Sequence, residues 1–180
     1  RVVMSVHVGL NSLALLQWGT EAQKPRWLAP QAKGDKYAMF GLTESGVGSD
    51  VANMISTARR DGTDYVINGE KMWISLATKA HHILWFAKTD SSANDPHEGI
   101  TAFMIDTREP GITTGDLHGK LGVRAGSTGW VNCNDVRVPH ENRLGEEGEG
   151  FKIAMSALDN GRYTVGSGAT GLIRASLEAS

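Results

Sequence analysis

Hydrophobic and polar positions change their period twice along the chain, and these changes predict helix, then strands, then helix. Residues 1–18 fit two periods, because some apolar side chains alternate as in a strand and others recur every three or four residues. The length of the segment and the glycine that follows it favour a helix. Its apolar positions on the helical period are Val2, Val6, Leu10, Leu13 and Leu16.

A capping-box pattern predicts a second short helix that opens at Thr20. Thr20 and Gln23 have the spacing at which each side chain can bond the main-chain N–H of the other. This helix is expected to end between Pro30 and Gly34. Pro25 implies that it begins late or bends, because proline has no N–H to donate.

Between residues 37 and 138 the pattern is that of short strands separated by turns. Asp61-Gly62 and Asn68-Gly69 are typical hairpin turns and predict a meander. No helical pattern interrupts the strands, which excludes a parallel sheet built from βαβ units and favours a compact antiparallel barrel or sandwich. After the strand that enters from residue 37, the predicted strands are 57–60, 65–67, 71–75, 82–88, 100–106, 112–115 and 130–138.

The helical period returns after Gly150, with apolar residues in steps of three and four up to position 172. Arg162 falls within this apolar stripe, where a guanidinium needs an anion. Asp159 lies three residues earlier and could form an ion pair with it. Four glycines between 161 and 171 each cost a helix ~1 kcal/mol relative to alanine. Either a large ligand or a tightly packed helix is therefore expected beside this backbone.

Composition places the chain among ordinary globular proteins and argues against several kinds of partner. The 180 residues are 40% hydrophobic with a net charge of −2, enough for one sizeable core. Basic residues are scattered, so we expect no nucleic-acid partner. No apolar run approaches the ~18 residues of a membrane span. The histidines show no chelating spacing, and no metal site is expected.

Two single residues bear on where the protein is found and how much of it the sequence holds. Cys133 is the only cysteine, which excludes an internal disulfide and is compatible with a reducing compartment. That compartment would be the cytoplasm, or the mitochondrial matrix if the protein is eukaryotic. The first residue is Arg1 and not methionine, which suggests a piece of a longer chain.

The most informative stretch is residues 40–50, FGLTESGVGSD, where an apolar strand ends in hydroxyl side chains interleaved with Gly46 and Gly48. Glycine permits positive φ and close approach, and successive free N–H groups form a concavity that favours anions. A plain polar turn between two strands is the alternative. The stretch is not a P-loop, since no Gly-Lys-Ser/Thr follows, and it lacks the third glycine of a dinucleotide fingerprint.

This stretch resembles the flavin-binding loop of acyl-CoA dehydrogenases, usually Leu-Thr-Glu-Pro-x-Ala-Gly-Ser-Asp. Three more stretches resemble the same family in the same order: residues 71–75 (KMWIS), the run 120–139, and the run 142–162. Four such motifs in order are highly specific. The departures leave the substrate open but not the membership. They are Ser45 for Pro, Val47 for Ala, Ser75 for the commoner Thr, and Gly126-Ser127 for Ser-Asp.

The resemblance implies an α+β fold: an antiparallel β-barrel or sandwich middle domain flanked by α-helical segments. It divides the chain into the end of an N-terminal helical domain (1–36), the middle β-domain (37–147) and the start of a C-terminal helical domain (148–180). It also implies FAD, an acyl-CoA substrate converted to the trans-2-enoyl thioester, and electrons passed to an electron-transferring flavoprotein. The full-length protein would be a homotetramer or homodimer. An acyl-CoA oxidase or flavin monooxygenase on the same scaffold, or a non-catalytic binding domain, is the alternative.

Site residues follow from the matched motifs. Of the flavin contacts, the Ser75 hydroxyl would stand near N5 of the ring, and Ser49 would also reach the acyl-CoA. The flavin-binding residues would be Phe40, Leu42, Thr43, Gly48, Ser49, Trp73, Ile74 and Ser75. The substrate-binding residues would be Ser49, Thr89, Asp159 and Arg162.

The resemblance places no catalytic base within the chain. Some relatives have a Glu immediately before the helix arginine, where this sequence has Gly161. Glu44 belongs to the flavin loop and is the wrong candidate. The base is therefore expected beyond Ser180.

Overall fold

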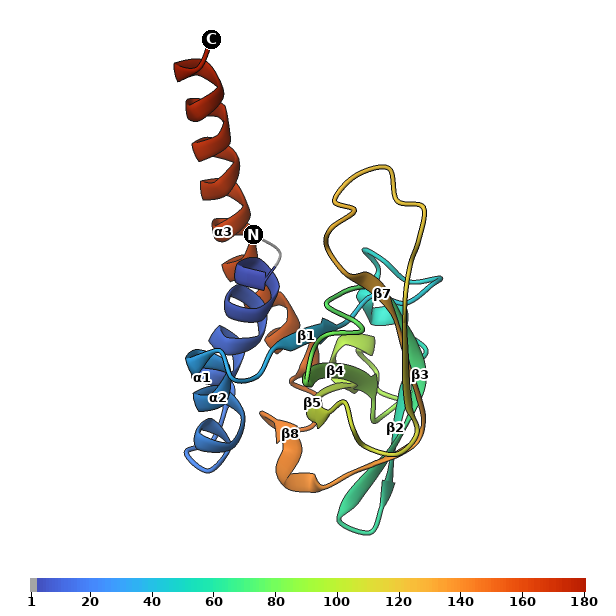
Figure 1. Ribbon diagram of the computed structural model, residues 1–180. Helices are drawn as coiled ribbons and strands as arrows, with labels where there is room; N and C mark the ends of the chain where they lie inside the picture. Colours follow the sequence, from blue (N-terminus) through green and yellow to red (C-terminus); the bar gives the residue numbers. More distant parts are fainter. Residues whose placement is uncertain (1–2) are drawn as a thin grey trace.

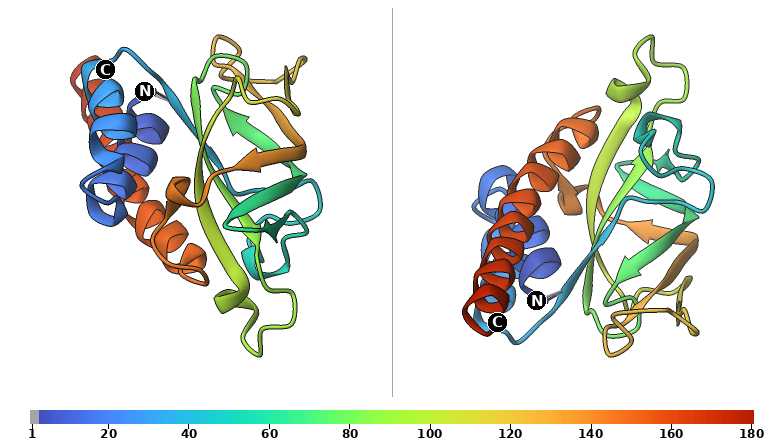
Figure 2. Two further views of the ribbon diagram at one scale, coloured as in Figure 1. Left: turned by 90° about the horizontal axis from the view of Figure 1, so that it is seen from below. Right: turned by 90° about the horizontal axis from the view of Figure 1, so that it is seen from above.

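The computed structural model of the protein describes residues 3–180, so that Arg1 and Val2 lie outside it. Helices from the two ends of the chain form a layer beside the strands (Figure 1, Figure 2). The helices are η1 (Val3–Ser12, of π type), α1 (Leu13–Trp18), η2 (Lys24–Leu28, also π type), α2 (Ala29–Lys33) and α3 (Gly150–Glu178). The strands are β1 (Ala38–Gly41), β2 (Thr57–Asp61), β3 (Asp64–Ser75), β4 (His82–Lys88), β5 (Ile100–Asp106), β6 (Ile112–Asp116), β7 (Thr128–Val138) and β8 (Arg143–Leu144). Short 3-10 turns are η3 (Val51–Asn53), η4 (Pro96–Gly99) and η5 (His140–Asn142). The α+β class expected from the sequence is confirmed.

The capping box forms as predicted. The Thr20 N–H donates to Gln23 Oε1 at 3.0 Å, and the Gln23 N–H donates to Thr20 Oγ1 at 3.2 Å. Helix η2 begins at Lys24, with Pro25 in its first turn, where a missing N–H costs nothing. Gly34 ends α2 in the left-handed conformation with φ +80°.

The eight strands form a mixed sheet and not a purely antiparallel one. The order is β6-β7-β3-β2-β4-β5-β8, and β1 pairs with β4. The β1–β4 pairing is parallel, and β2 meets β4 in parallel at Thr57 and Lys88. The antiparallel expectation was wrong at these two places, because the β2–β3 hairpin, and not a helix, carries the chain across between β1 and β4. A parallel pair needs a long connection, which can be built from strands.

Strand β3 is one continuous strand, so the hairpin predicted at Asn68-Gly69 is wrong. The Asn68 side chain instead bonds across to Asp135 on β7, donating to its carboxylate and accepting its main-chain N–H, each at 2.9 Å. Gly69 has φ +147°, and a Cβ there would lie 2.2 Å from Ser56 Oγ. The glycine serves a bulge and a close approach, which the Asn-Gly pair alone does not distinguish from a turn.

Two hydrophobic cores lie on either side of β4 and β5. Side chains alternate along β4, so that Ile83 and Trp85 enter the core shared with β3 and β7, while Leu84 and Phe86 enter the core under the helices. Both faces are covered, which explains the unbroken apolar run in this strand.

Helix α3 packs only in its first half, and its second half extends away from the other elements (Figure 1). A Cβ on Gly161 would lie 2.6 Å from Leu10 Cδ2, so this glycine permits close contact with η1, whereas Gly166 and Gly171 face open space. Arg162 is exposed, contrary to its expected place on a buried stripe, and pairs with Asp159 at 2.7 Å. The buried face is shifted by about one position, to Ile153, Ala154 and Ala157.

Within residues 3–180, no helix is both long and apolar enough to cross a membrane. The boundaries expected at residues 36 and 147 fall in connecting segments, one before β1 and one before α3. The division into domains stays a prediction.

Candidate functional site

The loop after β1, residues 42–49, is held against the end of β3. The Met72 N–H donates to the Thr43 carbonyl at 2.9 Å. Glu44 and Val47 exchange two main-chain hydrogen bonds of 3.0 and 3.2 Å, which close a tight turn around Ser45 and Gly46. The predicted loop is therefore an ordered turn with fixed ends.

Several N–H groups in this loop have no acceptor among residues 3–180. They belong to Ser45, Gly46, Gly48 and Ser49. A Cβ on Gly46 or Gly48 would meet no atom within 4 Å, and neither glycine has a positive φ. We had expected the turn to need glycine for a positive φ, and it does not. The glycines instead leave open space beside free donors, which suits an anionic ligand.

A β-bulge places an aromatic side chain beside this loop. The β3–β7 register shifts between Lys71 and Ile74, and within the bulge Trp73 has φ +62° and is 62% exposed. A bulky residue with positive φ is strained, and such strain is often kept at functional sites. Ile74 is buried and Ser75 half-buried. The exposed indole is unusual for a core aromatic and fits a ligand contact.

Three hydroxyl groups predicted to bind ligand have no partner among the described residues. They belong to Thr43, Ser49 and Ser75. Phe40 and Leu42 are buried in the core under the helices, and the Phe40 ring lies 5.1 Å from that of Phe86. These two side chains shape the base of the loop more than its surface.

The predicted substrate residues do not join this cluster. Thr89 follows β4, and its hydroxyl lies 2.7 Å from that of Thr101, which also accepts the Gly148 N–H at 3.1 Å. Asp159 and Arg162 lie on α3, while the segment between β1 and β2, cyan in Figures 1 and 2, lies across the strands from α3. A single ligand would have to be long to reach both groups.

A buried ion pair beneath the loop escaped the sequence interpretation. Lys71 Nζ lies 2.7 Å from Glu44 Oε1, and both side chains are almost fully buried. Burial by itself would raise the pKa of Glu44, but the Lys71 charge and the Ile55 N–H outweigh it and hold that pKa below its ordinary value. Burial lowers the pKa of Lys71 to about 8, although Glu44 opposes the shift. Because the Glu44 oxygens already accept from Lys71 and from the N–H groups of Ile55 and Ser56, Glu44 is not available as a general base.

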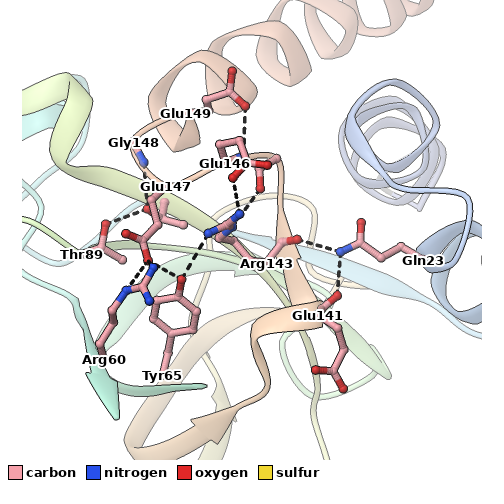
Figure 3. A network of polar contacts seen from close by, with 12 residues as sticks. Gln23, Arg60, Tyr65, Thr89, Glu141, Arg143, Glu146, Glu147, Gly148 and Glu149 are labelled. Carbon is pink, nitrogen blue, oxygen red and sulfur yellow. Dashed lines mark hydrogen bonds and ion pairs between the residues drawn. The ribbon is translucent and has the colours of Figure 1, made fainter. Parts of the chain in front are cut away.

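The fourth motif, residues 142–162, contains Arg143 and builds a polar junction between elements (Figure 3). Arg143 donates to the Gly145 carbonyl and contacts the Tyr65 hydroxyl, at 3.0 and 3.5 Å. Glu147 accepts from that hydroxyl and pairs with Arg60 at 2.8 Å. Burial, with Glu147 next, raises the pKa of Tyr65. The motif therefore ties β2 and β3 to the turn before α3.

Gln23 attaches the first helices to the same junction. Its side-chain amide donates to the carbonyls of Glu141 and Arg143 at 2.8 and 2.7 Å. The capping box gave a signal for Gln23, but nothing in the sequence indicated its second role.

One group of possible metal ligands lies at the surface of the described part of the chain. Asp64, His140 and Glu141 offer atoms within 4.8 Å of one another. Surface groups of this kind are common without a metal, and we assign no function to this one.

Comparison with known proteins decides the family. The family model described as "Acyl-CoA dehydrogenase, middle domain" matches residues 39–136. The chain is 44% identical over 177 residues to the mitochondrial short-chain specific acyl-CoA dehydrogenase of Bos taurus, covering 98% of this chain and 42% of that protein. The chain belongs to the acyl-CoA dehydrogenase family. It spans less than half the length of this relative.

Solved structures of the family have the same fold as the chain. Butyryl-CoA dehydrogenase from Megasphaera elsdenii matches with a TM-score of 0.86 and 41% identity, over 89% of this chain and 42% of that one. A glutaryl-CoA dehydrogenase from Mycobacterium smegmatis in complex with FADH2 matches with a TM-score of 0.89 and 38% identity, over 98% of this chain and 44% of that one. The acyl-CoA dehydrogenase fold is thus shown over nearly the whole chain.

Proposed function

We propose that the protein is an FAD-dependent acyl-CoA dehydrogenase, which removes an α-proton and a β-hydride from an acyl-CoA thioester to give the trans-2-enoyl thioester. One observation carries the proposal. Free N–H groups, free hydroxyls and the exposed Trp73 lie on two segments that the Thr43–Met72 hydrogen bond joins. When bound, FAD supplies the hydride acceptor, and a relative that is 38% identical was solved with FADH2.

In this proposal the loop and the bulge hold different parts of the flavin. The free N–H groups of Ser45, Gly46, Gly48 and Ser49 bind the pyrophosphate, because donors in open space attract an anion. Leu42 and Thr43 border the pyrimidine edge with Phe40 behind them, and Trp73 and Ile74 flank the ring. The Ser75 hydroxyl donates near N5, where a fixed donor stabilises developing negative charge.

The second group of residues is proposed to hold the CoA portion. Asp159 and Arg162 lie with Tyr163, Gly166 and Ser167 along one exposed side of α3, which is the surface proposed to hold the CoA. Thr89 and Ser49 are proposed to contact the acyl-CoA between this surface and the flavin. Short saturated thioesters are the first substrates to test, because the 44% identical relative is named short-chain specific.

The proton acceptor is proposed to come from a segment outside residues 1–180. The carboxylate of Glu44 forms an ion pair with Lys71, and that of Asp159 forms an ion pair with Arg162. Gly161 offers no side chain and packs against Leu10. General-base help is worth roughly 10²- to 10⁴-fold, so the chain alone should not turn over.

Electron acceptor, assembly and location complete the proposal. Electrons are passed to an electron-transferring flavoprotein, and the full-length protein is a homotetramer or homodimer. Exposed apolar side chains on the second half of α3 support such an assembly: Tyr163, Leu172, Ile173 and Leu177. The protein is placed in the cytoplasm, or in the mitochondrial matrix if eukaryotic, as its bovine relative is named mitochondrial.

The flavin band provides the test. The chain, and a longer reading frame that includes the downstream segment, are each held anaerobically with FAD and mixed with butyryl-CoA, glutaryl-CoA or a long saturated thioester. We expect no bleaching of the chain alone and bleaching of the longer protein by at least one thioester. Admitting oxygen afterwards separates a dehydrogenase, which reoxidises slowly, from an oxidase. Rapid bleaching of the chain alone would show that its own carboxylates supply the base.

A further inference from the structure

The buried pair Glu44–Lys71 is not explained by stability. The two side chains are 2% and 0% exposed, and the Nζ–Oε1 distance is 2.7 Å. Removing two charges from water is costly, and well-packed apolar residues in place of a buried ion pair are often as stable or more so. A pair kept under these conditions has another use, such as holding a specific geometry.

The Glu44 carboxylate fastens both ends of a long connection. Its own main chain belongs to the 42–49 loop, while its Oε2 accepts the Ile55 N–H at 2.6 Å and its Oε1 accepts the Ser56 N–H at 3.1 Å. Residues 44 and 56 are therefore held together by one side chain. The free N–H groups of residues 45–49 lie within the closed segment.

Lys71 fastens the same loop to the bulge. Its Nζ donates to the Leu42 carbonyl at 3.2 Å as well as to Glu44, so it grips the loop at two points. Lys71 is the residue at which the β3–β7 register begins to shift, directly before Met72 and the strained Trp73. One ammonium group thus connects the two segments that are proposed to hold the flavin.

The surroundings of Lys71 leave it no substitute for Glu44. The Trp85 ring centroid lies 5.2 Å from Nζ. The nearby thiol of Cys133 stays neutral, because burial raises its pKa to about 12. In the described part of the chain, Glu44 is the one ion-pair partner that Lys71 has.

We propose that Glu44 and Lys71 are positioning residues for the flavin site: without touching the ligand, they set the spacing between the free N–H groups of residues 45–49 and the Trp73–Ser75 segment. The inference rests on the proposed function, since it takes these two segments to be the flavin site. Its consequence is that FAD affinity depends on the hydrogen bonds of the pair and not merely on its neutrality.

The test uses the full-length holoprotein with three variants and one matched control. Lys71→Met leaves Glu44 buried alone, Glu44→Gln leaves Lys71 alone, and the double variant carries no net buried charge. The control is Ile105→Val, a truncation on β5 at the residue paired with Ile83 of β4; Ile105→Ala serves if a larger loss of Tm must be matched. FAD dissociation constants are measured by fluorescence, and hydrogen exchange is followed at the amides of Ile55, Ser56 and Met72.

We expect the double variant to recover most of the Tm that Lys71→Met loses, but to bind FAD at least tenfold more weakly than the parent and to exchange faster at the three amides. The control, at equal Tm, should bind FAD within twofold of the parent. Parental affinity and exchange in the double variant would overturn the proposal and leave the pair as simple charge balance. If single variants do not fold, the double variant decides. If the parent holds no flavin, the proposed function fails, while exchange at the three amides still tests whether the pair fixes the two segments.

Discussion

The Met72 N–H donates a 2.9 Å hydrogen bond to the Thr43 carbonyl, and so joins the first residues after β1 to the bulge of β3. The two segments are far apart in sequence, and each carries groups that have no partner among residues 3–180. A substitution in one segment should therefore alter the position of the other, so each variant needs a control outside both segments.

Ser75→Ala should change the flavin and not the fold. The Ser75 hydroxyl has no partner among residues 3–180, so its removal breaks no hydrogen bond in the protein. A lost donor near N5, worth ~1 kcal/mol, should lower the two-electron reduction potential by roughly 20 mV. Spectroelectrochemistry of the holoprotein measures the shift. Ser91→Ala, in the exposed loop after β4, is the control, and a potential equal to the parent's would refute the assignment of Ser75.

Arg162→Lys should weaken acyl-CoA binding with little effect on Tm. A point charge does not replace a planar fork in binding phosphate, and we expect a loss of about 3- to 10-fold in affinity. The Arg162–Asp159 pair is exposed, and such pairs add ~0–1 kcal/mol to stability.

Arg174→Lys provides the comparison for that prediction, since Arg174 forms a similar exposed pair with Glu178 at 2.8 Å on the same helix. Its affinity for acyl-CoA should equal the parent's. Lost Tm with unchanged affinity in Arg162→Lys would make that arginine an internal ion-pair partner only.

Gly69→Ala should strongly destabilise the chain. The new Cβ would lie 2.2 Å from Ser56 Oγ and 2.8 Å from Ser56 Cα, at φ +147°. Overpacking combined with backbone strain suggests a loss of roughly 3 kcal/mol or more in the free energy of unfolding. Gly62→Ala has strain without a clash, with φ +66° and no atom within 4 Å, and should lose only ~1 kcal/mol. Urea unfolding of both variants compares them; equal losses would show that close packing at Gly69 is unimportant.

Acid should weaken the attachment of the first helices through His82. Burial lowers its pKa to about 4, while Asp106 opposes the shift and Lys36, His81 and Arg108 add to it. The folded-state pKa lies below the unfolded value of ~6.5, so the unfolded chain binds the proton first as pH falls. The free energy of unfolding should therefore decrease from pH 6.5 to pH 4, by about 1–3 kcal/mol after allowance for solvent screening.

The pH experiment compares two adjacent histidines. His82 is buried and faces Trp27, with ring centroids 4.9 Å apart, whereas His81 precedes β4 and is half-buried. His82→Gln should flatten the decrease in stability between pH 6.5 and pH 5, and His81→Gln should keep it. An unchanged slope in His82→Gln would assign the acid sensitivity to other groups.

The order of helices, strands and a final helix, and most of the strands themselves, could be predicted from the sequence, because periodicity and turn chemistry are local. The errors arose where a local signal had two physical solutions. Asn68-Gly69 could close a hairpin or bridge to Asp135 across a bulge, and only the β7 partner decides. Arg162 lay on an apparent apolar stripe, but α3 turns the adjacent Gly161 toward η1, which leaves Arg162 exposed.

Long-range pairings were beyond the sequence for a different reason. Glu44 and Lys71 each looked ordinary within its own motif, and their ion pair depends on the loop after β1 meeting β3. The free N–H groups of residues 45–49 were expected from glycine content, yet these glycines do not use positive φ. The glycines keep the space beside these N–H groups open, and they are not needed for the backbone conformation of the loop.

The bulge in β3 also determines which side chains of the strand face the core. Lys71 and Ile74 are both buried although they are three residues apart, whereas residues on one face of a regular strand are an even number apart. Ser75, next to Ile74, is half-buried. With one residue fewer in the bulge, Ser75 would take the buried position of Ile74, and its hydroxyl would lie in the apolar core. Insertions and deletions, far more than substitutions, are therefore the changes that evolution or a designer must avoid between positions 71 and 75: the chemistry presented by this strand is determined by how many residues it contains.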